Sequence, residues 1–372
     1  MSISPQGSSR IGVALSGGGV RALIFHLGVF RRLAENGDWA KVSVISSVSG
    51  GSLAVGLILA ISRAAWPSAT SFVQDVLPKA RDFLVKVDIE RRYKRECFLR
   101  PLSLLNGRAH IVGKILRESW GLDASLRDLP DYPEFRINCT TYETGKNWRF
   151  SKEKMGDYLL GYIKHPDFPV SDAIAASAAF PGLIGPLRVR LDRKERTSTD
   201  FDKGGEEERL RSLTHVTLWD GGVYENLGVE SLYKQRKLQK NLDFLIVSDC
   251  SGQLGVEPVG WVNQILLHRR AFRLTNILAD QTRALRTRDI NHFFSEHKGA
   301  GCYIYIGSKV SDIFRCSSKV IPEEWRDVQA DELVRRCVQF KTTLRAVTFD
   351  EFDLLFQRGY EVALAVEAAF AP

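Results

Sequence analysis

The chain has 372 residues, of which 44% are hydrophobic, and a formal net charge of +8 at pH 7. A chain of this size can bury a sizeable core, so we expect one large domain with insertions. No apolar run approaches the about 18 residues of a membrane-spanning helix, and the N-terminal MSISPQGSSR lacks the features of a secretory signal. The sequence therefore predicts a soluble or peripheral protein.

Six cysteines lie far apart, with no C-x-x-C pair and no histidine at metal-ligand spacing. They are Cys97, Cys139, Cys250, Cys302, Cys316 and Cys337. This pattern favours reduced thiols in a cytoplasmic protein, and we expect neither a metal nor another cofactor.

The positive charge gathers in four basic segments, at 90–100, 188–196, 234–240 and 268–273. Solvated helix and loop faces are the simplest interpretation of such segments. If the charge has a function, its partner is anionic lipid or nucleic acid. No zinc finger, RNP motif or sustained heptad supports nucleic acid, so lipid is the preferred hypothesis.

The N-terminal part predicts one β-α-β unit. Residues 11–15 form a short strand that ends in the loop SGGG, and residues 21–35 form a helix buried on much of its surface. Residues 42–46 form the second strand and residues 52–62 the second helix. Both loops then lie at the carboxyl ends of parallel strands, where open α/β sheets bind ligands.

The later elements follow a mixed pattern. Residues 64–130 are basic and punctuated by prolines, and we expect a helical insertion that caps the sheet. Residues 191–211 have almost no apolar content and predict a flexible charged loop. The remaining expected elements are a hairpin at 135–142 and 147–151, an alanine-rich helix at 171–182, strands at 214–219, 244–248 and 302–306, and helices from about residue 262 onward.

The stretch SVSGG at 47–51 fits a nucleophile elbow, the strained turn between a strand and a helix that presents a catalytic serine. Small residues are needed two positions before and after that serine, which places Ser49 at the centre. Ser43, Ser46 and Ser47 lie in or beside the strand, and Ser52 is expected to cap or open the helix. Ser49 is therefore the candidate nucleophile.

Three glycines of the first loop offer consecutive backbone N–H groups at the start of a helix. Gly17, Gly18 and Gly19 therefore predict an oxyanion hole. A plain tight turn or a phosphate cradle is the alternative. No Gly-Lys-Ser/Thr follows, which excludes a P-loop, and the G-x-G-x-x-G dinucleotide pattern is not matched.

The chain has seven histidines, but none is well placed to activate Ser49. His26 falls inside the buried helix, and His215 faces the side of its strand opposite to Asp220. Three other histidines follow Ser49 and Asp220 in the chain order of an α/β-hydrolase triad, so a triad stays possible. None of the three sits in a tight loop after a strand: His268, His292 and His297.

Two aspartates compete with the histidines. Asp220 ends a predicted strand and precedes two glycines, so its carboxylate can project into a site while the backbone turns away. Asp249 has a similar place after FLIVS. A helix cap or a loop hydrogen bond is the simpler interpretation of both.

The motifs GVALSGGGVRA at 12–22, SVSGG at 47–51, AASAAFPG at 175–182 and DGGVYENLG at 220–228 together resemble the patatin-like phospholipases. The resemblance implies a three-layer α/β/α fold with a mostly parallel central sheet, and a Ser-Asp dyad without histidine. By motif match the nucleophile is Ser49, the general base is Asp220, and the oxyanion hole is formed by Gly17, Gly18 and Gly19. Arg21 braces the loop, and the supporting glycines are Gly51, Gly221 and Gly222. Asp249 matches no catalytic motif.

The resemblance implies a serine lipid acyl hydrolase of the phospholipase A or lysophospholipase type, working through an acyl-enzyme. The expected partners are a phospholipid or lysophospholipid and, transiently, an anionic membrane surface. The alternatives are a catalytically silent lipid-binding or regulatory module and an acyltransferase. Two positions depart from the family pattern, since Ser47 replaces the first elbow glycine and Ser16 stands where many relatives carry aspartate. Neither removes a reacting group.

Overall fold

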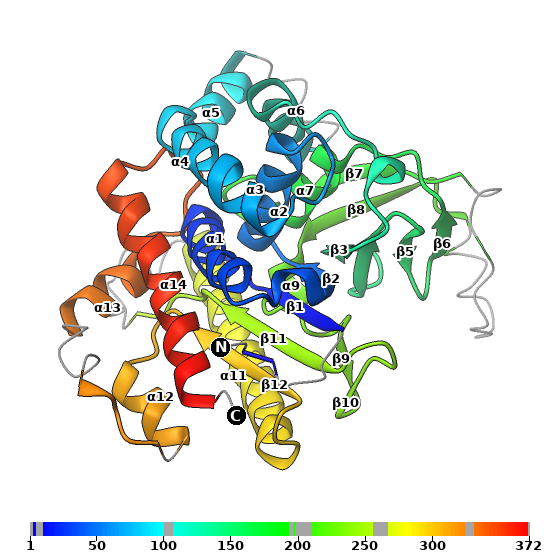
Figure 1. Cartoon of the computed structure of the whole chain (residues 1–372). Helices are drawn as coiled ribbons and strands as arrows, with labels where there is room; N and C mark the ends of the chain where they lie inside the picture. Colours follow the sequence, from blue (N-terminus) through cyan, green and yellow to red (C-terminus); the bar gives the residue numbers. More distant parts are fainter. Residues whose placement is uncertain are drawn as a thin grey trace.

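The computed structural model describes residues 3–4, 10–99, 107–192, 197, 210, 212–255, 267–317, 319–323 and 331–370. In this part of the chain a ten-stranded sheet lies between layers of helices (Figure 1). The predicted β-α-β unit is present as β1 (Ile11–Leu15), α1 (Gly19–Glu35), β2 (Val42–Ser47) and α2 (Gly50–Ile61).

The centre of the sheet is parallel. Its strands follow the order β12 (Gly301–Tyr305), β11 (Phe244–Asp249), β1, β2 and β3 (Glu134–Thr141). Successive side chains point to opposite faces, so Val13 packs into one core whereas Ala14 and Leu245 pack into the other. Burial on both faces is typical of a parallel sheet covered by helices.

Antiparallel strands extend the sheet beyond β3. The predicted hairpin is β3 with β4 (Asn147–Phe150), followed by β5 (Lys154–Asp157) and β6 (Gly161–Lys164). A second antiparallel pair consists of β7 (Leu187–Arg190) and β8 (His215–Asp220). Short β9 (Tyr233–Lys234) and β10 (Lys237–Leu238) form a separate two-stranded sheet.

The meeting of β8 with β2 positions the candidate site. β2 pairs with β3 up to Ser47 opposite Ile137, and β8 pairs with the next part of β3, with Asp220 opposite Cys139. Because β4 occupies one edge of β3, β2 and β8 share the other edge. β2 is parallel and β8 antiparallel to β3, so the C-terminal ends of β2 and β8 point toward each other. Asp220 therefore arrives beside the turn that carries Ser49.

Helices cover both faces of the sheet. α1, α2 and α14 (Phe349–Phe370) lie together on one face, with α12 (Val310–Ser317) and α13 (Asp331–Gln339) next to α14. On the other face α11 (Leu267–Glu296) contributes Ile290 and Phe293 to the second core. The predicted fold class, a three-layer α/β/α fold with a mostly parallel central sheet, is confirmed.

The described part of the segment 64–130 is largely helical. It contains α3 (Ala69–Ser71), a π-helical turn (Phe72–Val76), α4 (Leu77–Lys86), α5 (Ile89–Leu99), α6 (Ala109–Trp120) and a 3-10 turn (Leu126–Asp128). These helices form the upper end of the molecule in Figure 1, next to α7 (Val170–Ser177).

Two further expectations concern the surface of the chain. The charged loop predicted at 191–211 lies almost entirely outside the described residues. Among the helices that the structure describes, none combines the length and the apolar character that crossing a membrane requires.

Candidate active site

Ser49 lies on a strained turn between β2 and α2. Its φ of 50° and ψ of −114° belong to a region that favours glycine and that a serine adopts only when its surroundings enforce it. Val48 donates a backbone hydrogen bond to Leu15 at 3.0 Å, and Gly51 donates one to Ser16 at 3.1 Å. The turn is thus tied on both sides to the end of β1, as an elbow requires.

A cluster of buried hydroxyls supports the turn from below. The Ser49 N–H donates to the Ser177 hydroxyl at 3.0 Å, and that hydroxyl donates to the Asn138 carbonyl at 2.7 Å. Ser52 lies 2.8 Å from the Ser177 hydroxyl and donates to Ser47 at 2.9 Å. The amide of the candidate nucleophile is therefore held by the last residue of α7.

The two departures from the family pattern are both accommodated by hydrogen bonds. Ser47 is fully buried and accepts the bond from Ser52. The Ser16 hydroxyl accepts a hydrogen bond from the Cys250 N–H at 2.7 Å, which joins the glycine loop to the end of β11. Each extra hydroxyl therefore has a partner.

The glycine loop lies directly against Ser49. A Cβ atom on Gly17 would stand 2.9 Å from the Ser49 Cβ, so only glycine fits this approach. The Gly17 N–H donates to the Asn226 carbonyl at 3.1 Å and is already engaged. Among the described residues the N–H groups of Gly18 and Gly19 have no hydrogen-bond partner. Of the three predicted oxyanion donors, these two are the ones that the geometry leaves available.

Two contacts fix the conformation of this loop. Arg21 is buried, and its guanidinium donates to the carbonyls of Cys250 and Phe340. The Val20 N–H donates to the Thr343 carbonyl at 2.9 Å. Arg21 therefore takes the bracing place that the motif match implies, between the end of β11 and the segment after α13.

Asp220 ends β8 and is almost completely buried. Its Oδ1 accepts a hydrogen bond from the Gly222 N–H at 2.7 Å, and its own N–H donates to the Ala179 carbonyl at 3.2 Å. Its Oδ2 has no hydrogen-bond partner among the described residues. One carboxylate oxygen is thus fixed and the other is free to receive a proton.

Burial raises the pKa of Asp220 from 3.8 to about 7. The Gly222 N–H and the Ser49 side chain both act in the opposite direction, but burial outweighs them. Ser49 thus lies close enough to affect the pKa of the carboxyl, although Oδ2 accepts no hydrogen bond from a described residue. Catalytic hydrogen bonds are often long in unliganded sites.

The supporting glycines allow close backbone approaches. A Cβ on Gly51 would stand 2.6 Å from the Leu15 carbonyl oxygen, and one on Gly222 would stand 3.0 Å from Asp220 Oδ1. A Cβ on Gly221 would collide with the Asn138 carbonyl. Side chains at these positions would push apart the strands that bring Ser49 and Asp220 together.

The histidines lie elsewhere. His26 is buried between the Ser16 carbonyl and the Ser248 hydroxyl, and burial lowers its pKa to about 4, so it is a neutral core residue. His292 pairs with Glu296 at the surface, and His297 stacks on Phe293. The side chains of α11 near its start, His268 included, lie outside the described part. The strand pattern places His215 and Asp220 on opposite faces of β8, as predicted.

Asp249, the rival base, is engaged elsewhere. Its Oδ1 accepts from the Ser251 N–H at 2.8 Å, and its Oδ2 accepts from Tyr303 and from Arg283 at 3.1 Å. Both oxygens of Asp249 are therefore engaged by groups other than Ser49.

A cavity of about 690 Å³ opens over Ser49 and Asp220. Apolar side chains form much of its wall, and no histidine lines it among the described residues. Its apolar lining includes Tyr93, Phe180, Leu183, Ile184, Val338, Phe340 and Leu344. Sites of about 300–1,000 Å³ hold small ligands in proteins, so there is room for one beside Ser49.

The sequence motif AASAAFPG did not reveal what its residues do. Ser177 binds the amide of the candidate nucleophile, and Ala179 binds the amide of the candidate base. The only signal for this role was the motif itself, because a buried hydroxyl and a backbone carbonyl carry no chemical signature in a sequence.

The family model of the patatin-like phospholipases matches residues 13–233, more than half of the chain. The chain belongs to the patatin-like phospholipase family. A search of curated protein sequences finds no match.

Solved structures show the same fold. Human GIVD cytosolic phospholipase A2 has a TM-score of 0.57 at 13% identity, covering 97% of this chain and 59% of that one. Its complex with methyl gamma-linolenyl fluorophosphonate and terbium chloride has a TM-score of 0.54 at 12% identity, covering 99% and 58%. At such identity the likeness shows the fold alone, and this patatin-like chain spans less than two thirds of that protein.

Ser177→Ala tests how far the patatin-like site depends on α7. The variant removes the acceptor of the Ser49 N–H, and a shift near 1 Å can cost about a hundredfold in rate, so we expect kcat for ester hydrolysis to fall about ten- to hundredfold with little change in KM. The matched control is Ser231→Ala, which removes another buried hydroxyl, one that donates to Ser46. An equal loss of kcat in both variants would contradict a specific role of Ser177 in positioning Ser49.

Asp220→Asn tests the cost of burying this carboxyl. The carboxyl has a pKa near 3.8 in the unfolded chain and about 7 in the folded protein. Between these pH values folding takes up a proton, so the free energy of unfolding of the wild type falls as the pH rises. We expect the melting temperature of the variant to exceed that of the wild type by a margin that grows across this interval and is constant above it. Thermal melts across this pH range measure the margin. A difference in melting temperature that does not change with pH would refute the raised pKa of Asp220.

Proposed function

We propose that the protein is a serine lipid acyl hydrolase of the phospholipase A or lysophospholipase type, which works through a Ser49–Asp220 dyad. The observation that carries the proposal is the pairing of a serine on a strained elbow with a buried carboxyl that has one free oxygen. Family membership makes a lipid ester the natural substrate.

In the proposed reaction, Ser49 Oγ attacks the ester carbonyl while Asp220 Oδ2 accepts its proton. Negative charge then develops on the former carbonyl oxygen, and the N–H groups of Gly18 and Gly19 stabilise it. Asp220 returns the proton to the departing alcohol or lysophospholipid oxygen, which leaves an acyl ester on Ser49. Water attacks that ester while Asp220 accepts a proton from it, and Asp220 then returns the proton to Ser49 Oγ as the fatty acid is released.

Burial makes a carboxylate useful as the base here. An aspartate with a pKa near 3.9 is a weak base for a serine hydroxyl. The pKa of Asp220 is raised to about 7, which reduces the difference in pKa between the carboxyl and the hydroxyl. An acyl chain that fills the apolar cavity would exclude more water and strengthen the interactions with the oxyanion.

The proposed substrate is a phospholipid or a lysophospholipid. The largely apolar wall of the cavity suits an acyl chain. The human cytosolic phospholipase A2 of the same fold was solved with a lipid-like fluorophosphonate, which supports using long-chain lipids and fluorophosphonates as probes.

We also propose that the protein works in the cytoplasm, with peripheral contact to membranes. All six cysteines are free thiols, and four of them are buried. Free buried thiols are typical of proteins in a reducing compartment. We further propose that the helical segment 64–130 caps the cavity, because α5 contributes Glu90, Tyr93 and Lys94 to its lining.

The first test is hydrolysis of phosphatidylcholine and lysophosphatidylcholine, followed by mass spectrometry of the released fatty acid. Ser49→Ala should lose at least about a thousandfold in kcat, and Asp220→Asn at least about a hundredfold because a general base contributes that much. His268→Ala, His292→Ala and His297→Ala should retain activity.

Other outcomes of this test identify the alternatives. A comparable loss in one histidine variant would replace the dyad with a triad. Tight lipid binding by the wild type without release of fatty acid would indicate a catalytically silent module, and transfer of the acyl group to an added alcohol in preference to water would indicate an acyltransferase.

The pH dependence of the rate offers a second test. Asp220 accepts a proton only when ionised, so kcat/KM should rise with pH through a single ionisation near 7 and then level off. A profile that is flat from pH 5 to 9 would contradict a buried aspartate as the base.

A further inference from the structure

Two of the four basic segments in the sequence lie on helices that border the cavity. The segment 90–100 forms most of α5, and the segment 268–273 lies in the first turns of α11. α11 lines the cavity with Asn276, Ala279, Asp280 and Arg283. Among the described residues, the segments 188–196 and 234–240 contribute none to the cavity lining, and the residues of α11 that line it come after the segment 268–273.

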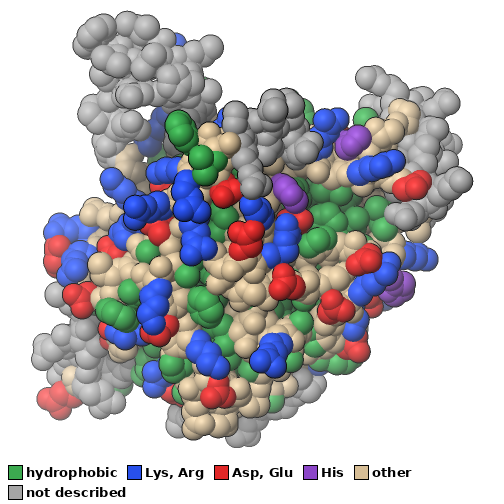
Figure 2. Space-filling view, turned by 90° about the horizontal axis from the view of Figure 1, so that it is seen from above, with side chains coloured by type: hydrophobic (Ala, Val, Ile, Leu, Met, Phe, Trp, Pro, Cys, Tyr) green, Lys and Arg blue, Asp and Glu red, His purple; other side chains and the backbone are tan. Residues whose placement is uncertain are grey.

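The outer side of α5 is both apolar and basic. Phe98 is 86% exposed and Leu99 62% exposed at the end of the helix, about one turn beyond the cavity residue Lys94. Arg91 and Arg95 are exposed on the same helix and have no acidic partner among the described residues. Figure 2, which views this end of the molecule, shows many Lys and Arg side chains with apolar ones between them.

The outer side of α11 carries a similar pattern. Arg270, Leu274 and Leu278 are spaced four residues apart and therefore lie along one side of the helix. Leu274 is 59% and Leu278 68% exposed, although large apolar residues on a helix of a globular protein usually face the core.

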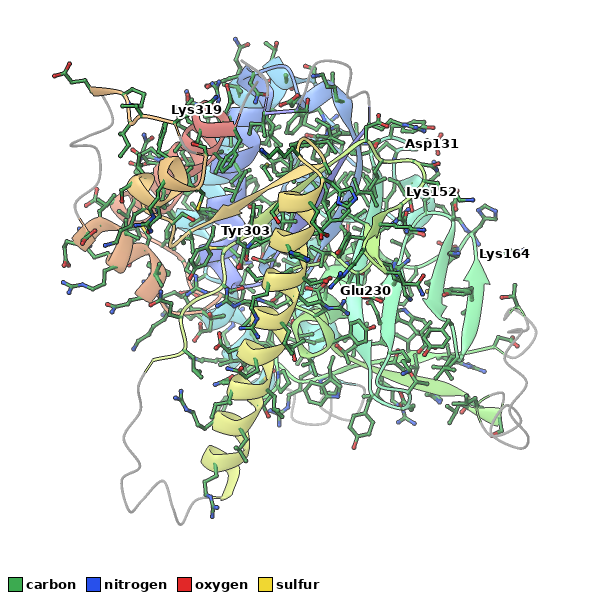
Figure 3. All side chains as sticks on the ribbon, turned by 90° about the horizontal axis from the view of Figure 1, so that it is seen from below. Asp131, Lys152, Lys164, Glu230, Tyr303 and Lys319 are labelled. Carbon is green, nitrogen blue, oxygen red and sulfur yellow. The ribbon has the colours of Figure 1, made fainter. Side chains whose placement is uncertain are left out.

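The second half of α11 is anchored to the body of the protein. Arg286 donates to Glu230 at 2.8 Å, and Thr287 lies 3.1 Å from the Tyr303 hydroxyl. Figure 3 shows Glu230 and Tyr303 beside α11, whose first half extends past the sheet. The orientation of α11 is therefore fixed, and the exposure of Leu274 and Leu278 follows from it.

We propose that Phe98, Leu99, Leu274 and Leu278, together with Arg91 and Arg95, form a docking rim that places the cavity against an anionic lipid bilayer. The rim rests on the proposed function, since a lipid hydrolase must take its substrate from such a surface. The apolar side chains enter the interfacial region, and the arginines remain at the level of the anionic head groups.

Charge and position favour a bilayer over a protein partner. The apolar side chains come from two separate helices whose shared feature is the cavity between them. A protein seated on both would cover the opening through which substrate reaches Ser49, whereas a bilayer supplies that substrate. Each arginine near an anionic membrane should strengthen binding by about fivefold at low salt.

Sedimentation with lipid vesicles tests the rim directly. The experiment uses full-length protein carrying Ser49→Ala, so that binding is measured without hydrolysis, and vesicles of phosphatidylcholine with or without phosphatidylserine. We expect stronger binding to the phosphatidylserine vesicles and weaker binding as salt is raised. Leu274→Ser with Leu278→Ser, and likewise Phe98→Ser with Leu99→Ser, should each lower binding by about tenfold or more.

Matched variants distinguish a specific role of the rim from a general effect of changing exposed residues. Arg91→Glu with Arg95→Glu should weaken binding to phosphatidylserine vesicles and leave the weak binding to phosphatidylcholine unchanged. Val320→Ser removes an apolar side chain that is 83% exposed but lies outside the cavity lining, and it should bind like the parent. Thermal melts confirm that each variant is folded.

The possible results also keep the rim distinct from the proposed function. Unchanged binding in the rim variants, or an equal loss in Val320→Ser, would overturn the rim. Equal binding to both kinds of vesicle would overturn the choice of an anionic surface. Rim-dependent binding by a protein whose wild type releases no fatty acid would support the rim and refute the hydrolase.

Discussion

The site depends on holding Ser49 at a φ of 50°, a conformation that costs about 1–3 kcal/mol for a residue with a side chain and persists only because its surroundings enforce it. Hydrogen bonds from Val48 to Leu15 and from Gly51 to Ser16 fix the turn to the first strand. The Ser49 N–H in turn donates to the hydroxyl of Ser177. Two residues later, the Ala179 carbonyl holds the Asp220 amide, so the end of α7 sets both partners of the proposed dyad.

Burial of Asp220 links the architecture to the chemistry. The carboxyl lies where β8 meets the end of β2, inside a sheet covered on both faces, and burial alone is the largest cause of its raised pKa. A carboxylate that the fold destabilises is a stronger base than a solvated one. The folded state is therefore less favourable above neutral pH, and under the proposed function this loss of stability provides the base for Ser49.

Local patterns in the sequence predicted the β-α-β unit, the hairpin at 135–151, the core position of His26 and the opposite faces of His215 and Asp220. The head-on meeting of β8 with β2 was beyond the sequence, because register between distant strands leaves no periodic signal. The engagement of the Gly17 amide by Asn226 depends on the same long-range packing. The basic segments at 90–100 and 268–273 were visible, but the fact that their helices, α5 and α11, line one cavity appears only once the chain is folded.

The central claim is that Ser49 is an activated nucleophile, and covalent labelling with a long-chain fluorophosphonate tests it most directly. Intact mass spectrometry of the wild type should show one adduct, peptide mapping should place it on Ser49, and Ser49→Ala should remain unmodified. Folded wild-type protein that gains no adduct, or an adduct that persists in Ser49→Ala, would contradict the account.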